Sequence, residues 1–231
     1  MNYEIKGGNF PVLLIDLESG ETITTEGGAM AWMSPNMEMA TEGGGSLGKA
    51  LGRLFSGEKI FRNQYTATGG RGLLAITAQL PGNILAIDIT PDTPLIVQKS
   101  SFLACTEGVS TEVFFNKKAS TGLFAGEGFI MQKVFGNGTV FIEVDGSTME
   151  YELESGQSII VDTGNLAMMD ITCSMDIQTV KGVKNVLFGG EGLFNTVITG
   201  PGRVTLQTMS VRNIAEAIIP YLPSQSSSSS D

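Results

Sequence analysis

Three glutamates that could act together stand at the ends of three copies of one short motif. Each copy reads Leu-Phe-x-Gly-Glu, and the last residues are Glu58, Glu127 and Glu191. If the chain has internal threefold symmetry, these carboxylates lie at equal distances from its axis, and a short distance would gather them into an acidic ring. Such a ring would bind a hard cation through oxygen ligands, or would raise its own pKa values.

A structural role for the same three glutamates is the interpretation that we favour. Each one follows a turn glycine and precedes a strand-like run, where its carboxylate can accept hydrogen bonds from loop amides or face solvent. We therefore predict no catalytic residue, no cofactor and no metal ligand. The acidic ring of Glu58, Glu127 and Glu191 is kept as the one candidate site.

Other familiar reaction chemistry has little support in this sequence. The chain contains no histidine, so Ser-His-Asp and Cys-His arrangements, and zinc sites that use histidine, are excluded. The two cysteines, Cys105 and Cys173, lie in separate apolar runs without Cys-x-x-Cys spacing. We expect both to be free, buried thiols.

The elements that must position these side chains are expected to be strands. Only 16% of the residues are charged, 42% are hydrophobic and 30 are glycine, a balance that favours short buried strands joined by tight turns. The fold class that the composition predicts is all-β.

The charge balance argues against nucleic acid as a partner. The formal net charge is −10, and the sequence has a single adjacent basic pair, Lys117-Lys118. Binding to phosphates needs the opposite balance or a dense basic patch. The start of the chain lacks signal-peptide features, and no apolar run approaches the ~18 residues of a spanning helix. We expect a cytoplasmic protein without a membrane span.

Internal repeats predict three tandem units of about 65 residues within one compact domain. Upstream of the first and third Leu-Phe copies lie the similar turns Leu17–Glu21 and Leu153–Gln157, with Ile89–Asp92 in the middle position. Downstream, a Gly-x-Gly turn opens a further strand in each unit, at Gly70–Gly72, Gly136–Gly138 and Gly200–Gly202. The predicted units are 1–88, 89–152 and 153–209.

Two further correspondences support the repeat. Glycine-containing segments that we interpret as hairpin turns link strand-like runs at Gly7–Asn9, Pro81–Asn83 and Asp145–Ser147. A small-residue and sulfur-rich strand recurs at Met30–Met33, Phe102–Cys105 and Leu166–Met169, and we expect it to face a core or an internal interface in all three units. The end strands 3–6 and 203–209 hold corresponding positions, so we expect the termini to close a ring or to lie near one another.

Two short segments are predicted to be helical. Ser46–Phe55 has leucines at helical spacing, and Val211–Ile219 follows Ser210 as N-cap and stops at Pro220. We place a C-terminal helix within 210–222. The serine-rich segment 223–231 has nothing to bury and is expected to be disordered.

These landmarks resemble a known family. The stretch Gly27–Met33, the Leu-Phe-x-Gly-Glu motifs and Gly200–Arg203 are similar to the uncharacterised bacterial and archaeal family related to the fungal altered-inheritance-of-mitochondria protein. The resemblance covers residues 1–220. It implies a double-stranded β-helix fold similar to the trp RNA-binding attenuation protein, repeated three times with pseudo-threefold symmetry, and it implies no reaction.

Three functions remain open from the sequence. We favour a non-catalytic interaction, scaffold or ligand-binding protein, with a protein partner or homo-oligomerisation through a sheet face or the sulfur-rich strands. The first alternative is an RNA-binding module by analogy of fold, although no basic position repeats between units. The second alternative is a carboxylate- or metal-dependent enzyme, whose residues only folding would bring together.

Overall fold

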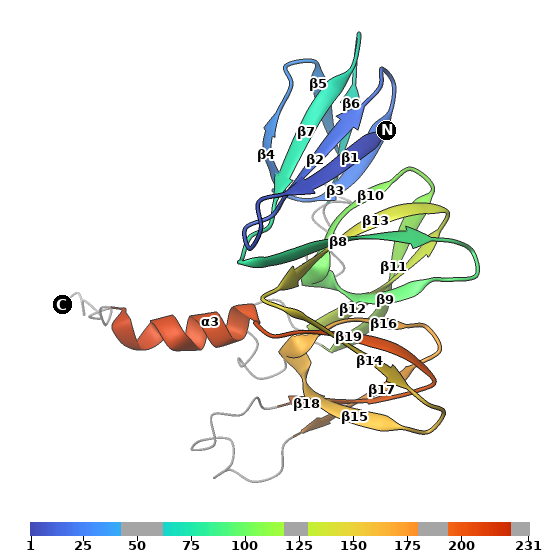
Figure 1. Cartoon of the computed structure of the whole chain (residues 1–231), viewed down its shortest axis with the longest axis vertical. Coiled ribbons are helices and arrows are strands. Elements are labelled where there is room, and N and C mark those ends of the chain that lie inside the picture. Colours follow the sequence, from blue (N-terminus) through green and yellow to red (C-terminus); the bar gives the residue numbers. More distant parts are fainter. Residues whose placement is uncertain (43–61, 118–128, 180–193, 223–231) are drawn as a thin grey trace, which may run out of the picture.

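A computed structural model describes residues 1–42, 62–117, 129–179 and 194–222, and in these ranges the chain is almost entirely β. The all-β prediction is confirmed. The strands fall into three successive series, which we call blocks 1, 2 and 3. Figure 1 shows the blocks stacked along the longest axis of the molecule, with block 1 at the top.

Each block contributes six strands to the described part of the chain. Block 1 follows β1 (Asn2–Lys6) and comprises β2 (Val12–Leu17), β3 (Thr22–Glu26), β4 (Met30–Met33), β5 (Met37–Glu42), β6 (Arg62–Ala67) and β7 (Gly72–Thr77). Block 2 comprises β8 (Gly82–Ile89), β9 (Leu95–Gln98), β10 (Phe102–Thr106), β11 (Val109–Lys117), β12 (Phe129–Gly136) and β13 (Gly138–Asp145). Block 3 comprises β14 (Thr148–Leu153), β15 (Ser158–Asp162), β16 (Leu166–Asp170), β17 (Ser174–Thr179), β18 (Phe194–Thr199) and β19 (Gly202–Gln207).

Strand pairing follows one pattern in every block. The first, sixth and third strands pair antiparallel in that order, which we call the leading set, as in β2-β7-β4. The second, fifth and fourth strands form the trailing set, as in β3-β6-β5. The register between the sixth and third strands shifts at the same step in all three blocks. The repeat boundaries at 88/89 and 152/153 and the threefold axis stay predictions.

Two seams join the blocks into continuous sheets. At the first seam β3 pairs with β10, so the trailing set of block 1 and the leading set of block 2 form one six-stranded sheet. At the second seam β9 pairs with β16 and makes an equivalent six-stranded sheet. The remaining sets lie at the two ends: β2-β7-β4, which β1 extends on the β2 side, and β15-β18-β17.

The hydrophobic core crosses the seams. Leu103, Ala104 and Phe141 of block 2 belong to the same buried cluster as the core of block 1. Ile96 and Met131 of block 2 belong to the cluster that fills block 3. Because a fully buried aliphatic or aromatic side chain contributes about 1.5–3 kcal/mol, neighbouring blocks stabilise one another.

A buried cation also spans the first seam. Arg62 on β6 donates a hydrogen bond from Nη2 to Oε1 of Gln132 on β12, at 3.1 Å. Its guanidinium carbon lies 4.2 Å from the centre of the Phe102 ring on β10. An amide oxygen and an aromatic face thus compensate part of the cost of removing the charge from water.

The glycine links between blocks correct one prediction. Only Gly7–Asn9 joins two paired strands, β1 and β2. Pro81–Asn83 and Asp145–Ser147 are not hairpin turns, since β7 and β8 belong to different sheets, as do β13 and β14. The chain passes there into the next sheet, and local spacing cannot distinguish such a crossing from a hairpin.

Repeated backbone hydrogen bonds hold these crossings. Gly82 N donates to Asn9 O at 2.8 Å, and Gly146 N donates to Pro81 O at 2.7 Å. A Cβ on Gly82 would meet the backbone oxygen of Val144, so only glycine fits at this crossing. Each of these two links is therefore hydrogen-bonded to the link that precedes it in the chain.

The arrangement of the termini also differs from the prediction. Strand β1 pairs with β2, whereas β19 pairs with β14 and β16. Figure 1 shows β1 in the block at the top of the column and β19 in its lower half. The two end strands do not close a ring within one chain, because the blocks are stacked in a column.

The C-terminal helix occurs where the sequence predicts it. Helix α3 covers Val211–Ile218, and Ser210 Oγ accepts the N–H of Asn213 at 3.3 Å as N-cap. A short 3-10 turn, η3 (Ile219–Tyr221), follows it, and two similar turns, η1 (Lys99–Ser101) and η2 (Thr163–Asn165), precede β10 and β16. Figure 1 shows α3 projecting sideways from the column. The predicted helix Ser46–Phe55 and the tail 223–231 lie outside the described residues.

Candidate functional site

The candidate acidic ring cannot be placed, because Glu58, Glu127 and Glu191 all lie outside the described residues. Its existence stays a prediction. Within the part of the chain that the structure describes, no group of three or more acidic, cysteine or histidine side chains could hold a metal ion. Both cysteines, Cys105 and Cys173, are free and buried, as predicted.

Two carboxyl groups with raised pKa values lie on one face of β13. Burial raises the pKa of Glu143, while hydrogen bonds to its Oε1 from the backbone N–H groups of Gln79 (2.7 Å) and Leu80 (3.3 Å) oppose the shift. Burial alone raises the pKa of Asp145 to about 6. Since Glu143 binds the segment between β7 and β8, its role is to hold the crossing between blocks.

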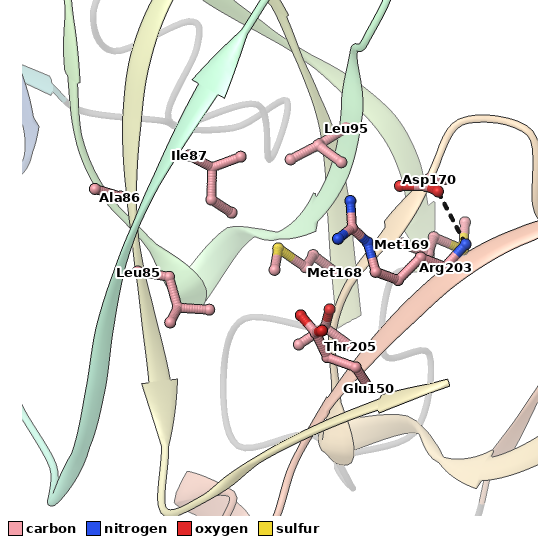
Figure 2. A pocket seen from close by; sticks show the side chains of 10 residues that line it. All are labelled: Leu85, Ala86, Ile87, Leu95, Glu150, Met168, Met169, Asp170, Arg203 and Thr205. Carbon is pink, nitrogen blue, oxygen red and sulfur yellow. Dashed lines mark hydrogen bonds between the residues drawn. The ribbon is translucent and has the colours of Figure 1, made fainter. Parts of the chain in front are cut away.

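A shallow cleft of about 210 Å³ lies on the second seam. Figure 2 shows apolar side chains of β8, β9 and β16 around it, with the Arg203 guanidinium pointing toward its centre and Glu150 at its edge. At the first seam, Phe141 takes the position of Thr205, and its ring packs edge-on against Tyr3 at 4.9 Å. The cleft is therefore a place where the second seam lacks an aromatic filling, and its charged side chains Glu150 and Arg203 are exposed.

In the described part of the chain, β4 and β15 each lack a pairing partner on the side where the seams would supply one. The third strands of blocks 2 and 3 pair on both sides, but β4 pairs only with β7. The second strands of blocks 1 and 2 also pair on both sides, but β15 pairs only with β18. Other sheet edges, such as β5, β11 and β17, are edges in every block. Among the strands that the structure describes, only β4 and β15 are open where both of their counterparts are closed.

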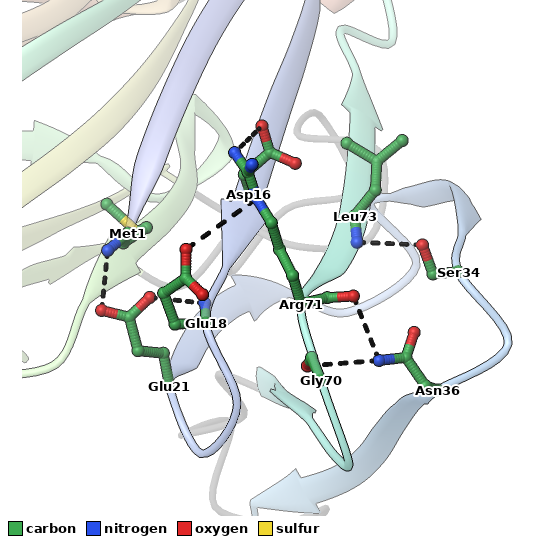
Figure 3. Close-up of polar contacts among 9 residues, drawn as sticks. All are labelled: Met1, Asp16, Glu18, Glu21, Ser34, Asn36, Gly70, Arg71 and Leu73. Carbon is green, nitrogen blue, oxygen red and sulfur yellow. Dashed lines mark hydrogen bonds and ion pairs between the residues drawn. The ribbon is translucent and has the colours of Figure 1, made fainter.

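A repeated side-chain contact holds β4 in the same way as its paired counterparts. Ser34, directly after β4, accepts the N–H of Leu73 through Oγ at 3.0 Å (Figure 3). The same contact recurs in block 2 from Thr139 N to Thr106 Oγ1 at 2.9 Å, and in block 3 from Arg203 N to Asp170 Oδ2 at 2.9 Å. The open strand is therefore fixed in the conformation of a seam strand.

A second repeated contact positions β15. In the turn that leads into it, Gln157 Oε1 accepts the N–H of Glu154 at 2.9 Å. Glu21 does the same for Glu18 before β3, at 2.8 Å, where it also binds the N-terminal ammonium group (Figure 3). Both turns belong to the repeated Leu-Glu-Ser-Gly segment of the sequence. The open strand β15 thus enters its sheet as β3 does.

Apolar side chains are exposed on these two strands at positions that one or both seams bury. Ile160 on β15 is 64% exposed, whereas Ile96, its counterpart on β9, is 0% exposed. On β4, Trp32 is 49% and Met33 is 37% exposed. The counterparts of Met33, which are Cys105 and Met169, are buried. The two ends of the column therefore expose the apolar residues of an incomplete seam.

The sulfur-rich strands partly match their prediction. Strands β10 and β16 face internal interfaces as expected, but β4 does not, because among the described strands it pairs with β7 alone. Sequence reasoning singled out Met30–Met33 without recognising its exposure, and it missed Ile160. The signal for Ile160 is its alignment with Ile96 through the repeated turns.

Comparison with known proteins identifies the family. The family model for AIM24, described as mitochondrial biogenesis AIM24, matches residues 3–209. The chain belongs to this family. An uncharacterised protein of Streptococcus pyogenes serotype M6 is 29% identical over 226 residues, which cover 94% of this chain and 89% of that protein.

A solved crystal structure of a similar protein has the same fold. The X-ray crystal structure of a Streptococcus pyogenes protein matches with a TM-score of 0.79 and 25% sequence identity. The match covers 96% of this chain and 99% of the other. The descriptions of these relatives name no reaction. Membership of the AIM24 family therefore does not establish a function, which has to be inferred from the structure. In the described ranges, no helix has the length and apolar character to cross a membrane.

We predict that Asp145→Asn stabilises the protein above pH 6. A folded-state pKa of about 6, against an ordinary value of 3.8, means that the stability from protonated Asp145 is complete below pH ~4 and lost as the pH rises through 6. Because the carboxyl group is only partly buried, we expect a gain of about 1 kcal/mol at pH 7.5 and none at pH 4. Urea denaturation of the wild type and the variant at both pH values measures this gain in the free energy of unfolding. The exposed Asp176→Asn is the control, and an equal gain at both pH values would contradict this account.

We predict unequal costs for the same truncation at Ile96 and Ile160. In dilute, monomeric protein, Ile96→Ala leaves a cavity at the second seam and should cost about 2–5 kcal/mol. Ile160→Ala removes an exposed side chain and should change the stability by less than about 0.5 kcal/mol. Chemical denaturation of both variants tests the pair. Similar losses would show that β15 is already covered within the chain.

Proposed function

We propose that this protein is a non-catalytic interaction protein that binds a protein partner along its open strands, β4 and β15. The observation that carries the proposal is the exposure of Trp32 and Met33 at positions that both seams bury, and of Ile160 at a position that the second seam buries. A strand edge offers a partner a row of backbone N–H and C=O groups, and its side chains select that partner.

The sequences of the two strands support this function. Proteins usually protect open edges with lysine, proline or inward-facing charges. Strand β4 reads Met-Ala-Trp-Met and contains no charged residue, and β15 has a single charge at its last residue, Asp162. Unprotected apolar edges favour aggregation and bring a monomer no benefit. We therefore infer that partners cover both edges.

The two alternative functions have weaker support. For RNA binding, the described basic side chains Arg71 and Lys133 form ion pairs with Asp16 and Glu112, and the open strands contain no cation. For a carboxylate enzyme, the raised pKa of Glu143 belongs to a residue that holds a crossing between blocks. Neither arrangement favours catalysis or phosphate binding over a protein interface.

Radical footprinting in cells that express the full chain tests the proposed function. The oxidation rate of Met33 should fall several-fold in cells relative to dilute purified protein, because a bound strand covers it. Met39 on β5 and Met149 on β14 are exposed on edge strands that take no part in either seam, so they serve as internal controls. If Met33 oxidises as fast as these controls in cells, the open strands have no partner and the proposal fails.

A further inference from the structure

We propose that the cleft on the second seam binds an extended peptide segment of a partner protein, which pairs with β8 and places an aromatic side chain in the cleft. The precedent lies within the chain, where β1 pairs antiparallel with β2. Strand β8 is the counterpart of β2, and among the described strands it pairs with β13 alone. This inference goes beyond the proposed function, because the site uses neither β4 nor β15.

The pairing registers define where a bound segment would lie on β8. Ile15 on β2 lies opposite Leu74, and Ile87 on β8 lies opposite Val140, in both cases two residues after the last glycine of the Gly-x-Gly turn. Ile15 is therefore the counterpart of Ile87. Because Tyr3 on β1 lies opposite Ile15, the aromatic residue of a bound segment would lie opposite Ile87.

Strand β1 helps to fill the first seam at the place where the second seam has its cleft. The rings of Tyr3 and Phe141 pack edge-on with their centres 4.9 Å apart, and Phe141 is the counterpart of Thr205, which lines the cleft. Ile15 at the first seam is 0% exposed, whereas Ile87 at the cleft is only half-buried. The second seam therefore lacks the strand and the tyrosine that the first seam has.

The size and lining of the cleft suit one aromatic ring. Its volume of about 210 Å³ exceeds the ~150 Å³ of an apolar protein cavity that binds benzene. Figure 2 shows Leu85 and Ile87 on β8, together with Leu95 on β9, pointing toward the cleft. The exposed Arg203 guanidinium points toward its centre, where it can stack on the face of a ring.

The open edge of β8 suits the addition of a strand. Proteins protect sheet edges with lysine, proline or inward-facing charges. Strand β8 contains neither lysine nor proline, and its single charged residue is Asp88. The backbone N–H and C=O groups of such an edge pair with an extended peptide, while a pocket beside the edge selects its side chain.

The segment that binds must come from another protein, because β1 is already used. All of Asn2–Lys6 pairs with β2, and the N-terminal ammonium group binds Glu21 Oε1 at 2.7 Å. In block 2 the position of Glu21 is held by the uncharged Thr93, as the equivalent turn contacts show. The site therefore offers no partner for a free ammonium group, and we expect it to take an internal or acetylated segment.

Peptide binding to the full chain tests the proposal. The probe is a peptide with the sequence of residues 1–6, acetylated at its N-terminus and labelled with fluorescein at its lysine. Fluorescence polarisation should show saturable binding, which phenylalanine in place of the tyrosine preserves. Alanine in its place should weaken binding by about tenfold or more, because the buried ring is lost. Equal binding of the alanine peptide, or no saturable binding of the tyrosine peptide, would overturn the proposal.

Substitutions in the chain test whether the peptide occupies the cleft. Ile87→Glu places a carboxylate beside Arg203 and should weaken binding by about tenfold. Arg203→Ala removes the stacking cation and should weaken it by about three- to tenfold. Tyr151→Glu changes the exposed counterpart of Ile87 on β14, outside the cleft, and should leave binding unchanged. Thermal melting verifies that each variant is folded, and cleft variants that bind as the wild type does would refute the site.

Photo-cross-linking tests the register. With benzoylphenylalanine in place of its tyrosine, the peptide should label Met168 or Leu95, whose side chains line the cleft. Labelling of Phe141, which contacts Tyr3 at the first seam, would show that the peptide replaces β1 and would overturn the proposal. Because the site lies on β8, these results do not depend on what covers β4 and β15.

Discussion

The pairing of β3 with β10 and of β9 with β16 is the constraint on which the rest of the structure depends. Each pairing merges two three-stranded sets into one sheet and buries apolar side chains such as Ile96 and Met169 between blocks. A three-stranded set is close to the smallest sheet that is stable on its own. The blocks therefore complete one another, and the sets at the two ends are left incomplete.

The polar contacts serve this constraint by fixing the strands that the seams use. Ser34, Thr106 and Asp170 differ in chemistry, yet each accepts the same backbone N–H from the neighbouring strand. Glu143 and Gln207 likewise accept backbone N–H groups next to the crossings between blocks. Because these contacts do not depend on a covering strand, they keep β4 ordered although it is open. The protein thus presents a preformed edge, which lowers the entropic cost of binding.

Sequence reasoning succeeded where a local signal decides the structure. The second glycine of each Gly-x-Gly turn, at Gly72, Gly138 and Gly202, begins a strand, and Ser210 caps the predicted helix. It failed where pairing between distant strands decides. Pro81–Asn83 has the composition of a hairpin turn, and only the pairing of β8 with β13 shows that the chain changes sheets there. The exposure of Trp32 and Ile160 was equally hidden, because it depends on which distant strands pair with β4 and β15.

The central claim is that a protein partner covers the two strands at the ends of the column, β4 and β15. Hydrogen exchange of the backbone amides in these strands, compared between the dilute purified protein and the same protein in cell extract, tests this claim most directly. The account predicts that protection in both strands rises in the extract, while β5 and β17, which are edges in every block, stay unchanged. Exchange in β4 and β15 that is as rapid in the extract as in the purified protein would contradict it.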